Sequence, residues 1–507
     1  MSQNLPRYHA ARWDEPIITE MSQPGRRGMI FNGDESADAL IPAALARKNR
    51  PHLPELSEPE VFRHYLHLAQ MTLGMQGVSL FGTCTMKYNA PVSEAIAWRP
   101  EMAETHPLQD ETTLQGTLEF LHRFDLMLRD LSGMDQFVFQ PGGGADAAYT
   151  NCAVTRAWLA ARGELGKRDE IITSIQAHPC NPATAATAGF KVVTLTLEEN
   201  GYPSLEQLKA AVSDRTAALM IGNPDDMGIY NPDIKEWVRI VHEAGGLCFY
   251  DHANFNGVMG KLRARELGFD ACMYMLHKTF GAPKGGNGPS VGAYGCSAEL
   301  APFLPAPIVA RIEDRYHLDY DRPQSCGKIR EYFGNVQQVM KAYAWTVAMG
   351  GDGIHEASDL SVLANNYMDA RLGKIRGLAR SHPHISAHRM EMTRWSMAPL
   401  REQTGVSVFD VQRRMTDFGI DAFWLSHEPW VVPEPFTPEA GEMWSKEEID
   451  RWIDVLAAVI DEAYTTPDVV KLSPHNQAIH QLDGSRLNDP AHFATTMRRY
   501  RQISKAD

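Results

Sequence analysis

Seven short β-like runs that alternate with helical patterns constrain the fold of this 507-residue chain most strongly. Helical patterns such as those at residues 145–163 and 233–246 lie between the runs. This alternation favours an α/β fold with a mostly parallel central sheet that is covered on both faces. We therefore expect the chemistry at the carboxyl ends of the strands. The runs are residues 136–140, 170–174, 191–197, 217–223, 247–251, 271–276 and 291–296.

The segments before the first run predict an arm and helices. Residues 1–60 are rich in Pro, Arg and Gly with little periodicity, so we expect an extended arm over the surface or along a partner. Residues 58–75 and 111–133 have apolar side chains at helical spacing, and the second helix should stop at Gly133.

The segments after the last run predict a second domain. We expect long helices over residues 335–380, a smaller α/β pattern from residue 381 and an acidic helix at 445–464. The predicted organisation is an N-terminal arm with helices (1–110), a large domain (111–345) and a small C-terminal domain (346–507).

Composition excludes several classes of protein. The net charge is −14 and no Lys/Arg run stands out, which argues against a nucleic-acid binder. No stretch approaches about 18 apolar residues, so no membrane-spanning helix is expected. The seven cysteines are widely spaced without a Cys-x-x-Cys pair, and the N-terminus lacks an apolar signal core. These features predict a cytoplasmic protein without a disulfide framework.

Two strand ends carry the main chemical signal. The run 247–251 ends on Asp251, the run 271–276 is followed by His277-Lys278, and a glycine-rich loop at 285–288 comes next. A lysine is rarely buried unless it is paired. Pyridoxal phosphate (PLP) would explain it: a lysine forms a Schiff base, a carboxylate keeps the pyridine nitrogen protonated, and backbone amides bind the phosphate. The alternative is a strand-end lysine that points into water.

Other strand ends carry weaker signals. Gly142-Gly143-Gly144 opens a helix whose N–H groups could bind an anion, but neither dinucleotide nor Walker spacing is present. His178 could stack on a flat cofactor or be an ordinary structural histidine. Asn223 precedes a proline, which usually marks a turn. Its amide could instead form a hydrogen bond with the phenolic oxygen of a PLP ring. No metal site is predicted, because the histidines near strand ends share no ligand spacing.

The motifs together resemble subunit 2 of the glycine decarboxylase P-protein, the cofactor-carrying half where that enzyme is split in two. The combination of Cys-Thr-Met-Lys-Tyr-Asn at 84–89 with Leu-His-Lys-Thr-Phe at 276–280 is the most specific part. Further colinear motifs are Gly82-Thr83, His106-Pro107, Gln115-Gly116, Ala177-His178, Asn181-Pro182-Ala183, Asp251-His252-Ala253-Asn254-Phe255-Asn256 and Asp319-Tyr320-Asp321-Arg322-Pro323.

The resemblance implies a fold-type-I PLP enzyme that decarboxylates glycine and passes the aminomethyl group to the lipoyl arm of H-protein. Lys278 would bind the cofactor covalently, Asp251 would pair with the pyridinium and His178 would stack on the ring. The remaining cofactor-binding set is Gly143, Gly144 and Ala145 at the phosphate, with Asn223, Ala253, His277 and Thr279. Subunit 1, H-protein and a homo- or hetero-oligomer are the implied partners.

Departures from the family leave the substrate open. Asp146 stands where the family has a histidine, His252 where it has a glycine, and Lys284 and Asn287 alter the loop after the lysine. In the second domain the family's His-Glu pair is not clearly matched around Glu391. The alternative is therefore a PLP-dependent decarboxylase, lyase or transferase that acts on another amino acid or acceptor. A non-catalytic paralogue is disfavoured, because Lys278, Asp251 and His178 are all retained.

Overall fold

The computed structural model describes residues 5–28, 40–49, 51–72, 78–80, 87–283, 290–423, 425, 431–482 and 484–503. Gly82–Met86, Lys284 and Asn287 lie outside these ranges. The chain divides into two compact units: residues 80–408 with 423–457, and residues 1–79 with 409–422 and 458–507. The domain boundaries at residues 110 and 345 stay a prediction, because compactness does not test which segments fold independently.

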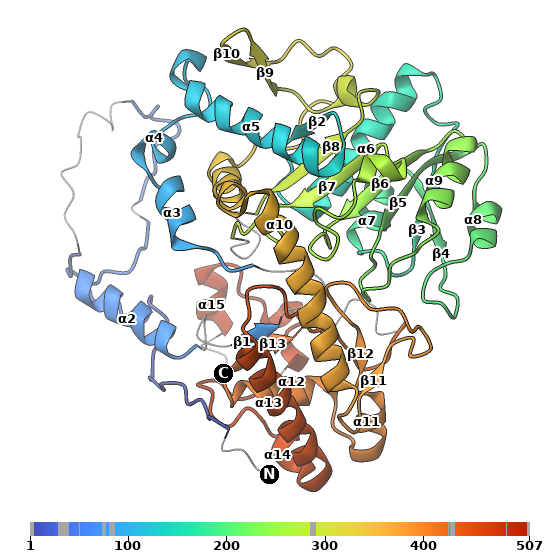
Figure 1. Cartoon of the computed structure of the whole chain (residues 1–507). Coiled ribbons are helices and arrows are strands. Elements are labelled where there is room, and N and C mark those ends of the chain that lie inside the picture. Colours follow the sequence, from blue (N-terminus) through green and yellow to red (C-terminus); the bar gives the residue numbers. More distant parts are fainter. Residues whose placement is uncertain are drawn as a thin grey trace. The chain divides into compact units, whose positions relative to one another are not determined.

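A seven-stranded sheet of order β2-β8-β7-β6-β5-β3-β4 forms the centre of the larger unit (Figure 1). Strands β4, β3, β5, β6 and β7 are mutually parallel, and β8 runs antiparallel to both β7 and β2. All seven predicted runs are confirmed as strands of this sheet. They are β2 (Gln136–Val138), β3 (Glu170–Ser174), β4 (Lys191–Leu195), β5 (Thr216–Gly222), β6 (Leu247–His252), β7 (Ala271–Met275) and β8 (Gly292–Cys296).

Helices cover both faces of the sheet because successive strand residues alternate between two cores. Phe249 and Met273 belong to the core with α6 (Gly144–Ala161) and α7 (Cys180–Thr187). Tyr250 and Tyr274 belong to the opposite core, which contains side chains of three further helices. These are α5 (Gln115–Ser132), α9 (Ile234–Glu243) and α10 (Val336–Leu372). Helix α8 (Leu205–Ala211) packs near β4.

Two helix ends illustrate how glycine sets the boundaries. The predicted stop of α5 at Gly133 is confirmed, since this residue takes the left-handed conformation with φ 75°. Within α10, Gly350 has φ 62° and ψ −179° and interrupts the helix. The long helices expected over residues 335–380 are therefore two helical segments joined at Gly350.

The larger unit also contains elements that the sequence pattern did not predict. Strands β9 (Ile308–Ile312) and β10 (Arg315–Asp319) form an antiparallel pair. A three-stranded sheet joins β11 (Ala379–Arg380), β12 (Trp395–Ser396) and β14 (Pro435–Phe436). The helices α3 (Pro91–Ala97), α4 (Pro100–Ala103) and α11 (Ala398–Thr404) complete it.

The smaller unit contains the N-terminal segment and the C-terminal helices. Residues 5–28 contain neither helix nor strand, as expected of an arm. The elements of this unit are α2 (Glu58–Gln70), α14 (Pro467–Lys471), α15 (Met497–Ile503) and most of the strand pair β1 (Val78–Leu80) and β13 (Ile420–Phe423).

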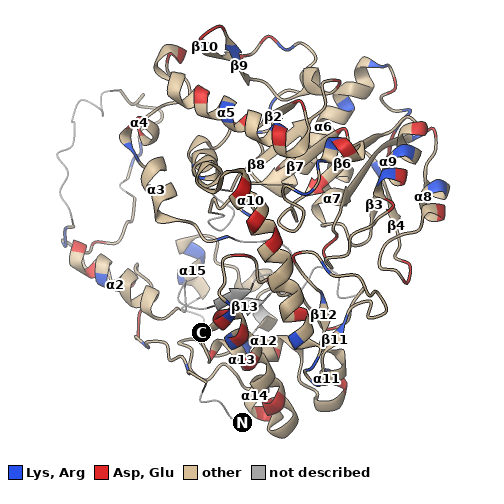
Figure 2. Cartoon of the chain, viewed as in Figure 1, with Lys and Arg blue, Asp and Glu red and all other residues tan. Residues whose placement is uncertain are grey.

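Two helices, α12 (Val408–Thr416) and α13 (Lys446–Thr465), contain the boundaries between the units. Figure 2 colours Asp and Glu positions on α13 red, and Glu447 and Glu448 lie in its first turn, which confirms the predicted acidic helix. In the part of the chain that the structure describes, no helix combines the length and apolar character needed to cross a membrane.

His252 is a core residue of the sheet. It follows Asp251 on β6, so its side chain enters the opposite face from that carboxylate. Its ring centroid lies 3.8 Å from that of Tyr250 and 4.8 Å from that of Phe255, and neither ring nitrogen has a hydrogen-bond partner among the described residues. Burial lowers the pKa of His252 to about 3. The departure from glycine at this position therefore fills the core.

Replacing His252 by phenylalanine should reduce the sensitivity of the fold to acid. The unfolded chain takes up a proton at this histidine near pH 6.5, whereas the folded chain does so only near pH 3. Stability should therefore fall between these pH values in the wild type and fall less in His252→Phe. We also expect about 1 kcal/mol of stabilisation at pH 7, because two unpaired polar atoms leave the core. Denaturant unfolding at several pH values measures both, and an unchanged pH dependence would contradict this role.

Candidate active site at the carboxyl edge of the sheet

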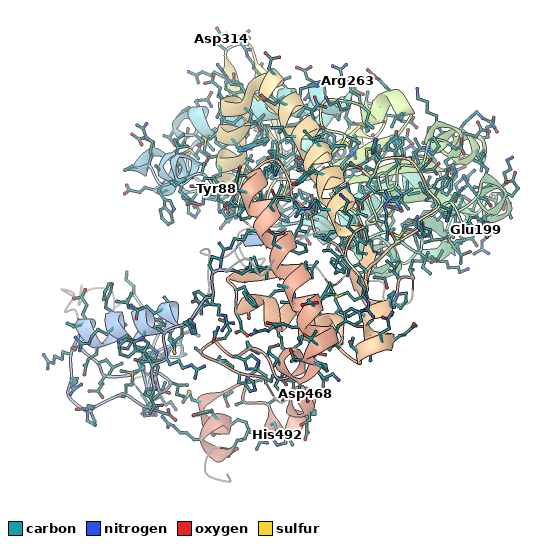
Figure 3. The ribbon with its side chains drawn as sticks, turned by 60° about the horizontal axis from the view of Figure 1, so that its bottom comes forward. Tyr88, Glu199, Arg263, Asp314, Asp468 and His492 are labelled. Carbon is teal, nitrogen blue, oxygen red and sulfur yellow. The ribbon has the colours of Figure 1, made fainter. Side chains whose placement is uncertain are left out.

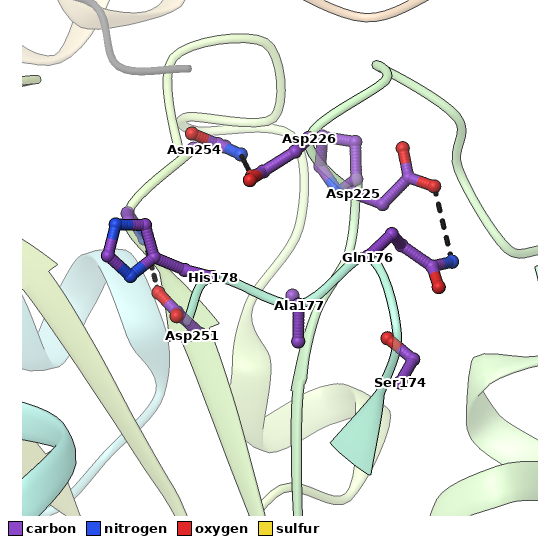
Figure 4. A pocket seen from close by; sticks show the side chains of 11 residues that line it. Ser174, Gln176, Ala177, His178, Asp225, Asp226, Asp251 and Asn254 are labelled. Atoms are coloured by element: carbon purple, nitrogen blue, oxygen red, sulfur yellow. Dashed lines mark hydrogen bonds between the residues drawn. The ribbon is translucent and has the colours of Figure 1, made fainter. Parts of the chain in front are cut away.

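A cavity lies where the central parallel strands end (Figure 4). It contains three of the predicted site residues, namely His178 after β3 and Asp251 and Ala253 at the end of β6. Lys278 follows β7 and is buried. The full lining is Ser174, Gln176, Ala177, His178, Gly222, Pro224, Asp225, Asp226, Asp251, Ala253 and Asn254.

Asp251 is the buried carboxylate of this cavity. Its Oδ1 accepts a hydrogen bond from the Ala253 N–H at 2.9 Å, and its Oδ2 accepts one from Asn181 Nδ2 at 3.1 Å. Burial raises the pKa of Asp251, while the Ala253 N–H, the charge of Lys278 and the Asn181 amide lower it. Lys278 therefore lies close enough to act on Asp251 electrostatically. Asn181 is a positioning residue that the sequence showed only as part of a motif.

The glycine loop opens helix α6 as predicted. Gly143 is the N-cap and the helix begins at Gly144, so the N–H groups of its first turn, including that of Ala145, have no intrahelical partner. Asp146 accepts a hydrogen bond from the Gly142 N–H at 3.0 Å. Asp146 thus closes the loop with its carboxylate, which is a structural role for this departure.

Arg330 is a cation beside this loop, and no sequence motif pointed to it. A Cβ atom built on Gly142 would lie 1.9 Å from Arg330 Nη1, so the guanidinium covers this glycine. The neighbouring backbone is held nearby, because the Ile329 N–H donates to Gln140 Oε1 at 3.3 Å. The structure therefore adds a positive charge to the predicted anion-binding loop.

The remaining predicted residues are placed around the strand ends but do not line the cavity. Asn223 bonds the backbone of Asn231 through both polar atoms, at 3.1 Å and 2.8 Å. Its predicted contact with the cofactor stays a prediction, and Asn254 is the amide that does line the cavity. His277 Nδ1 lies 3.2 Å from the Val291 carbonyl oxygen. Thr279 is buried.

Motifs far apart in sequence meet around the loop that follows Lys278. Lys87 forms a buried ion pair with Glu442, and its Nζ lies 5.0 Å from the centre of the Trp345 ring. Asn89 donates to the Gly281 carbonyl at 2.7 Å. Glu442 also accepts hydrogen bonds from the Asn256 amide at 3.1 Å and the Ser361 hydroxyl at 3.2 Å.

The same motif has an outward-facing residue. Tyr88, between Lys87 and Asn89, is 57% exposed and is labelled in Figure 3. Its backbone N–H lies 2.9 Å from Met443 Sδ. The contacts of Lys87 and Asn89 therefore hold the backbone of this motif, while the ring of Tyr88 faces solvent.

Family models match two parts of the chain. Residues 136–297 match the aminotransferase class-V model, and residues 357–480 match the glycine dehydrogenase C-terminal domain model. The aminotransferase match confirms a PLP-dependent enzyme class and the predicted cofactor.

Solved structures with similar folds agree with the predicted fold class. A glycine decarboxylase P-protein of the glycine cleavage system in inhibitor-bound form matches with a TM-score of 0.69 at 20% identity, over 84% of this chain and 95% of that one. A NifS-like protein matches with a TM-score of 0.58 at 16% identity, over 76% of this chain and 99% of that one. These matches confirm the α/β architecture of fold-type-I PLP enzymes.

Sequence relatives cover nearly the whole chain. A probable glycine dehydrogenase (decarboxylating) subunit 2 of Pyrococcus abyssi is 43% identical over 94% of this chain and 95% of that protein. A protein of the same name from Caldanaerobacter subterraneus is 37% identical over 92% of this chain and 96% of that protein. The chain therefore belongs to the family of glycine dehydrogenase (decarboxylating) subunit 2.

Proposed function

We propose that this protein decarboxylates glycine with PLP and transfers the aminomethyl group to a lipoyl carrier protein, as subunit 2 of a glycine dehydrogenase. The observation that carries the proposal is the buried carboxylate of Asp251 in a cavity at the sheet edge, with Lys278 close by. The family and its aminotransferase-type fold support this assignment.

The chemistry of the cavity lining fits PLP. Asp251 is a buried carboxylate that a protonated ring nitrogen would stabilise, and His178 and Ala253 offer an imidazole and a methyl group to flank the ring. When bound, PLP supplies an electron sink for the carbanion left by decarboxylation. The protein's own task is to hold the proton on the ring nitrogen through Asp251 and the phosphate through α6.

Two of the departures from the family pattern, His252 and Asp146, do not favour a different substrate. His252 packs in the core, Asp146 closes the glycine loop, and neither lines the cavity. These two departures from the family therefore have structural explanations that do not involve the substrate. Glycine remains the proposed substrate, and another amino acid or acceptor on the same scaffold is the alternative.

Exposed apolar side chains in the N-terminal segment support a protein partner. Leu40, Leu45, Leu53 and Phe62 are 83%, 76%, 72% and 69% exposed, respectively. Clusters of exposed large apolar residues mark interaction surfaces. We assign this segment to contact with subunit 1 or a second copy of this chain, and we propose that H-protein delivers the lipoyl arm. The six described cysteines are all unpaired, which supports the cytoplasm as the location.

Lys278→Ala should abolish covalent attachment of the cofactor. The purified wild-type protein should be yellow, and borohydride should fix PLP to the peptide that contains residue 278. Lys341→Ala is the matched control, since Lys341 is a similarly buried lysine that pairs with Glu94 at 2.7 Å. Peptide mapping by mass spectrometry tests this. PLP fixed at another lysine would contradict the assignment of Lys278.

The substrate is tested with the loaded wild-type protein. Glycine should change the absorption spectrum of bound PLP at lower concentration than any other amino acid in a panel of the common twenty. A stronger response to a different amino acid would contradict glycine as the substrate and identify that amino acid instead. The PLP assignment would stay intact.

Arg330→Ala should weaken binding of PLP without weakening binding of pyridoxal, which lacks the phosphate. Loss of a charge-assisted contact predicts a decrease of about tenfold in PLP affinity. Lys328→Ala is the control, because the Lys328 ammonium bonds the Tyr332 carbonyl at 2.8 Å instead. Fluorescence titration of the apoprotein measures both ligands. Equal losses for PLP and pyridoxal would mean that Arg330 supports the fold and not the phosphate.

A further inference from the structure

Two consecutive aspartates, Asp225 and Asp226, line the cavity and differ in how their oxygens are used. Asp225 Oδ1 accepts hydrogen bonds from the N–H groups of Met227 and Ile229, both at 2.9 Å. Its Oδ2 lies 3.4 Å from Gln176 Nε2, as Figure 4 shows. Asp225 therefore organises the turn that follows the cis Asn223-Pro224 bond.

Asp226 has an oxygen without a partner. Its Oδ1 accepts a hydrogen bond from Asn254 Nδ2 at 2.9 Å. Its Oδ2 is buried and has no hydrogen-bond partner among the described residues, although the side chain is only 6% exposed. A buried carboxylate oxygen without a donor is costly, so the site calls for a donor that the protein alone does not supply. Figure 4 shows the bond between Asp226 and Asn254.

The nearby amides also present acceptors. Gln176 Oε1 and Asn254 Oδ1 are buried without partners, and both residues line the cavity. A group that completes Asp226 Oδ2 must carry an N–H or O–H donor. A primary ammonium has three donors and a positive charge that matches Asp226.

Among the carboxyl groups around the cavity, Asp226 is the one suited to bind a cationic ligand. Arg394 donates to the main-chain oxygen of Asp226 at 3.2 Å and to the Thr437 hydroxyl at 3.3 Å, and its charge lowers the pKa of Asp225. Burial raises the pKa of Glu391 to about 8, so this neighbour holds a proton at pH 7. Asp251 is engaged by Asn181 and Ala253 and is suited to the ring nitrogen.

We propose that Asp226 binds the α-ammonium group of the incoming amino acid and accepts one of its protons. The N–H bond of the ammonium breaks and an O–H bond forms at Asp226 Oδ2, which leaves the substrate as a neutral amine with a free lone pair. The proton returns to a product amine when it leaves, so no other reactant is needed. This role rests on the proposed function, since it assumes an amine substrate at the PLP cavity.

Asp226→Asn tests the role, and Asp225→Asn is its matched control in the same turn. Both substitutions keep the side-chain shape and the Oδ1 acceptor, which serves two backbone N–H groups at Asp225 and the Asn254 amide at Asp226. Asp225→Asn loses only the 3.4 Å contact with Gln176. The PLP-loaded proteins are treated with borohydride so that the cofactor stays on the lysine and only non-covalent binding is measured. Calorimetry then compares glycine with glycolate, which has a hydroxyl in place of the ammonium. Asp226→Asn should weaken glycine binding about tenfold or more and leave glycolate within about twofold.

A second readout does not depend on the substrate. Because the unpartnered Oδ2 costs free energy in the apoprotein, Asp226→Asn should raise its thermal midpoint by roughly 2–4 °C. Asp225→Asn should not raise it, since Asp225 is already satisfied. A lower midpoint for Asp226→Asn would indicate a structural carboxylate and overturn the proposal.

The binding outcomes separate this inference from the proposed function. Equal losses of glycine and glycolate, or no loss of either, would reject Asp226 as the ammonium site. Failure of the wild-type protein to take up PLP would reject the proposed function itself. If PLP binds and glycine does not, glycine is rejected as substrate, and the thermal midpoints then decide the role of Asp226.

Discussion

The site depends on one buried carboxylate, that of Asp251 at the carboxyl end of β6. Strand alternation turns it toward the face that α6 and α7 cover, and Asn181 of α7 and the Ala253 N–H then hold its two oxygens. A charge in such a position is stable only when it is hydrogen-bonded and faces a cation. The fold thereby buries a carboxylate that suits the cationic ring nitrogen of our proposal, and it keeps Lys278 within electrostatic reach.

A second buried charge holds the surrounding loops. The ion pair of Lys87 and Glu442 joins segments from opposite ends of the larger unit, and Asn89 fastens the backbone at Gly281, three residues after Lys278. Breaking a buried ion pair by removing one partner is strongly destabilising. The described part of the motif at residues 84–89 is therefore tied through Asn89 to the loop that follows Lys278.

Periodicity predicted the sheet well, because each strand is a compact apolar run between clear helical patterns. The direction of β8 and the β9–β10 pair were not predicted, since run length carries no information on strand direction. At the site, the sequence identified residues next to strand ends in the chain: Asp251, His178 and Lys278. It could not identify Arg330 and Asn181, whose roles come from packing against Gly142 and Asp251.

His252 and Asp226 show the limit of reading substitutions alone. His252 departs from the family but is a neutral core residue between Tyr250 and Phe255. No sequence motif singled out Asp226. The structure does, because one of its carboxylate oxygens is buried at the cavity without a hydrogen-bond donor among the described residues. Which residues determine the substrate therefore follows from the direction of side chains and from unsatisfied polar atoms, neither of which the linear sequence records.

The central claim is that this chain decarboxylates glycine through Lys278-bound PLP. The most direct measurement is exchange of labelled bicarbonate into the carboxyl group of glycine, with PLP, lipoyl H-protein and subunit 1 present. We expect exchange with the wild-type chain and none with Lys278→Ala. Absence of exchange with the fully PLP-loaded wild-type chain and both partners would contradict it.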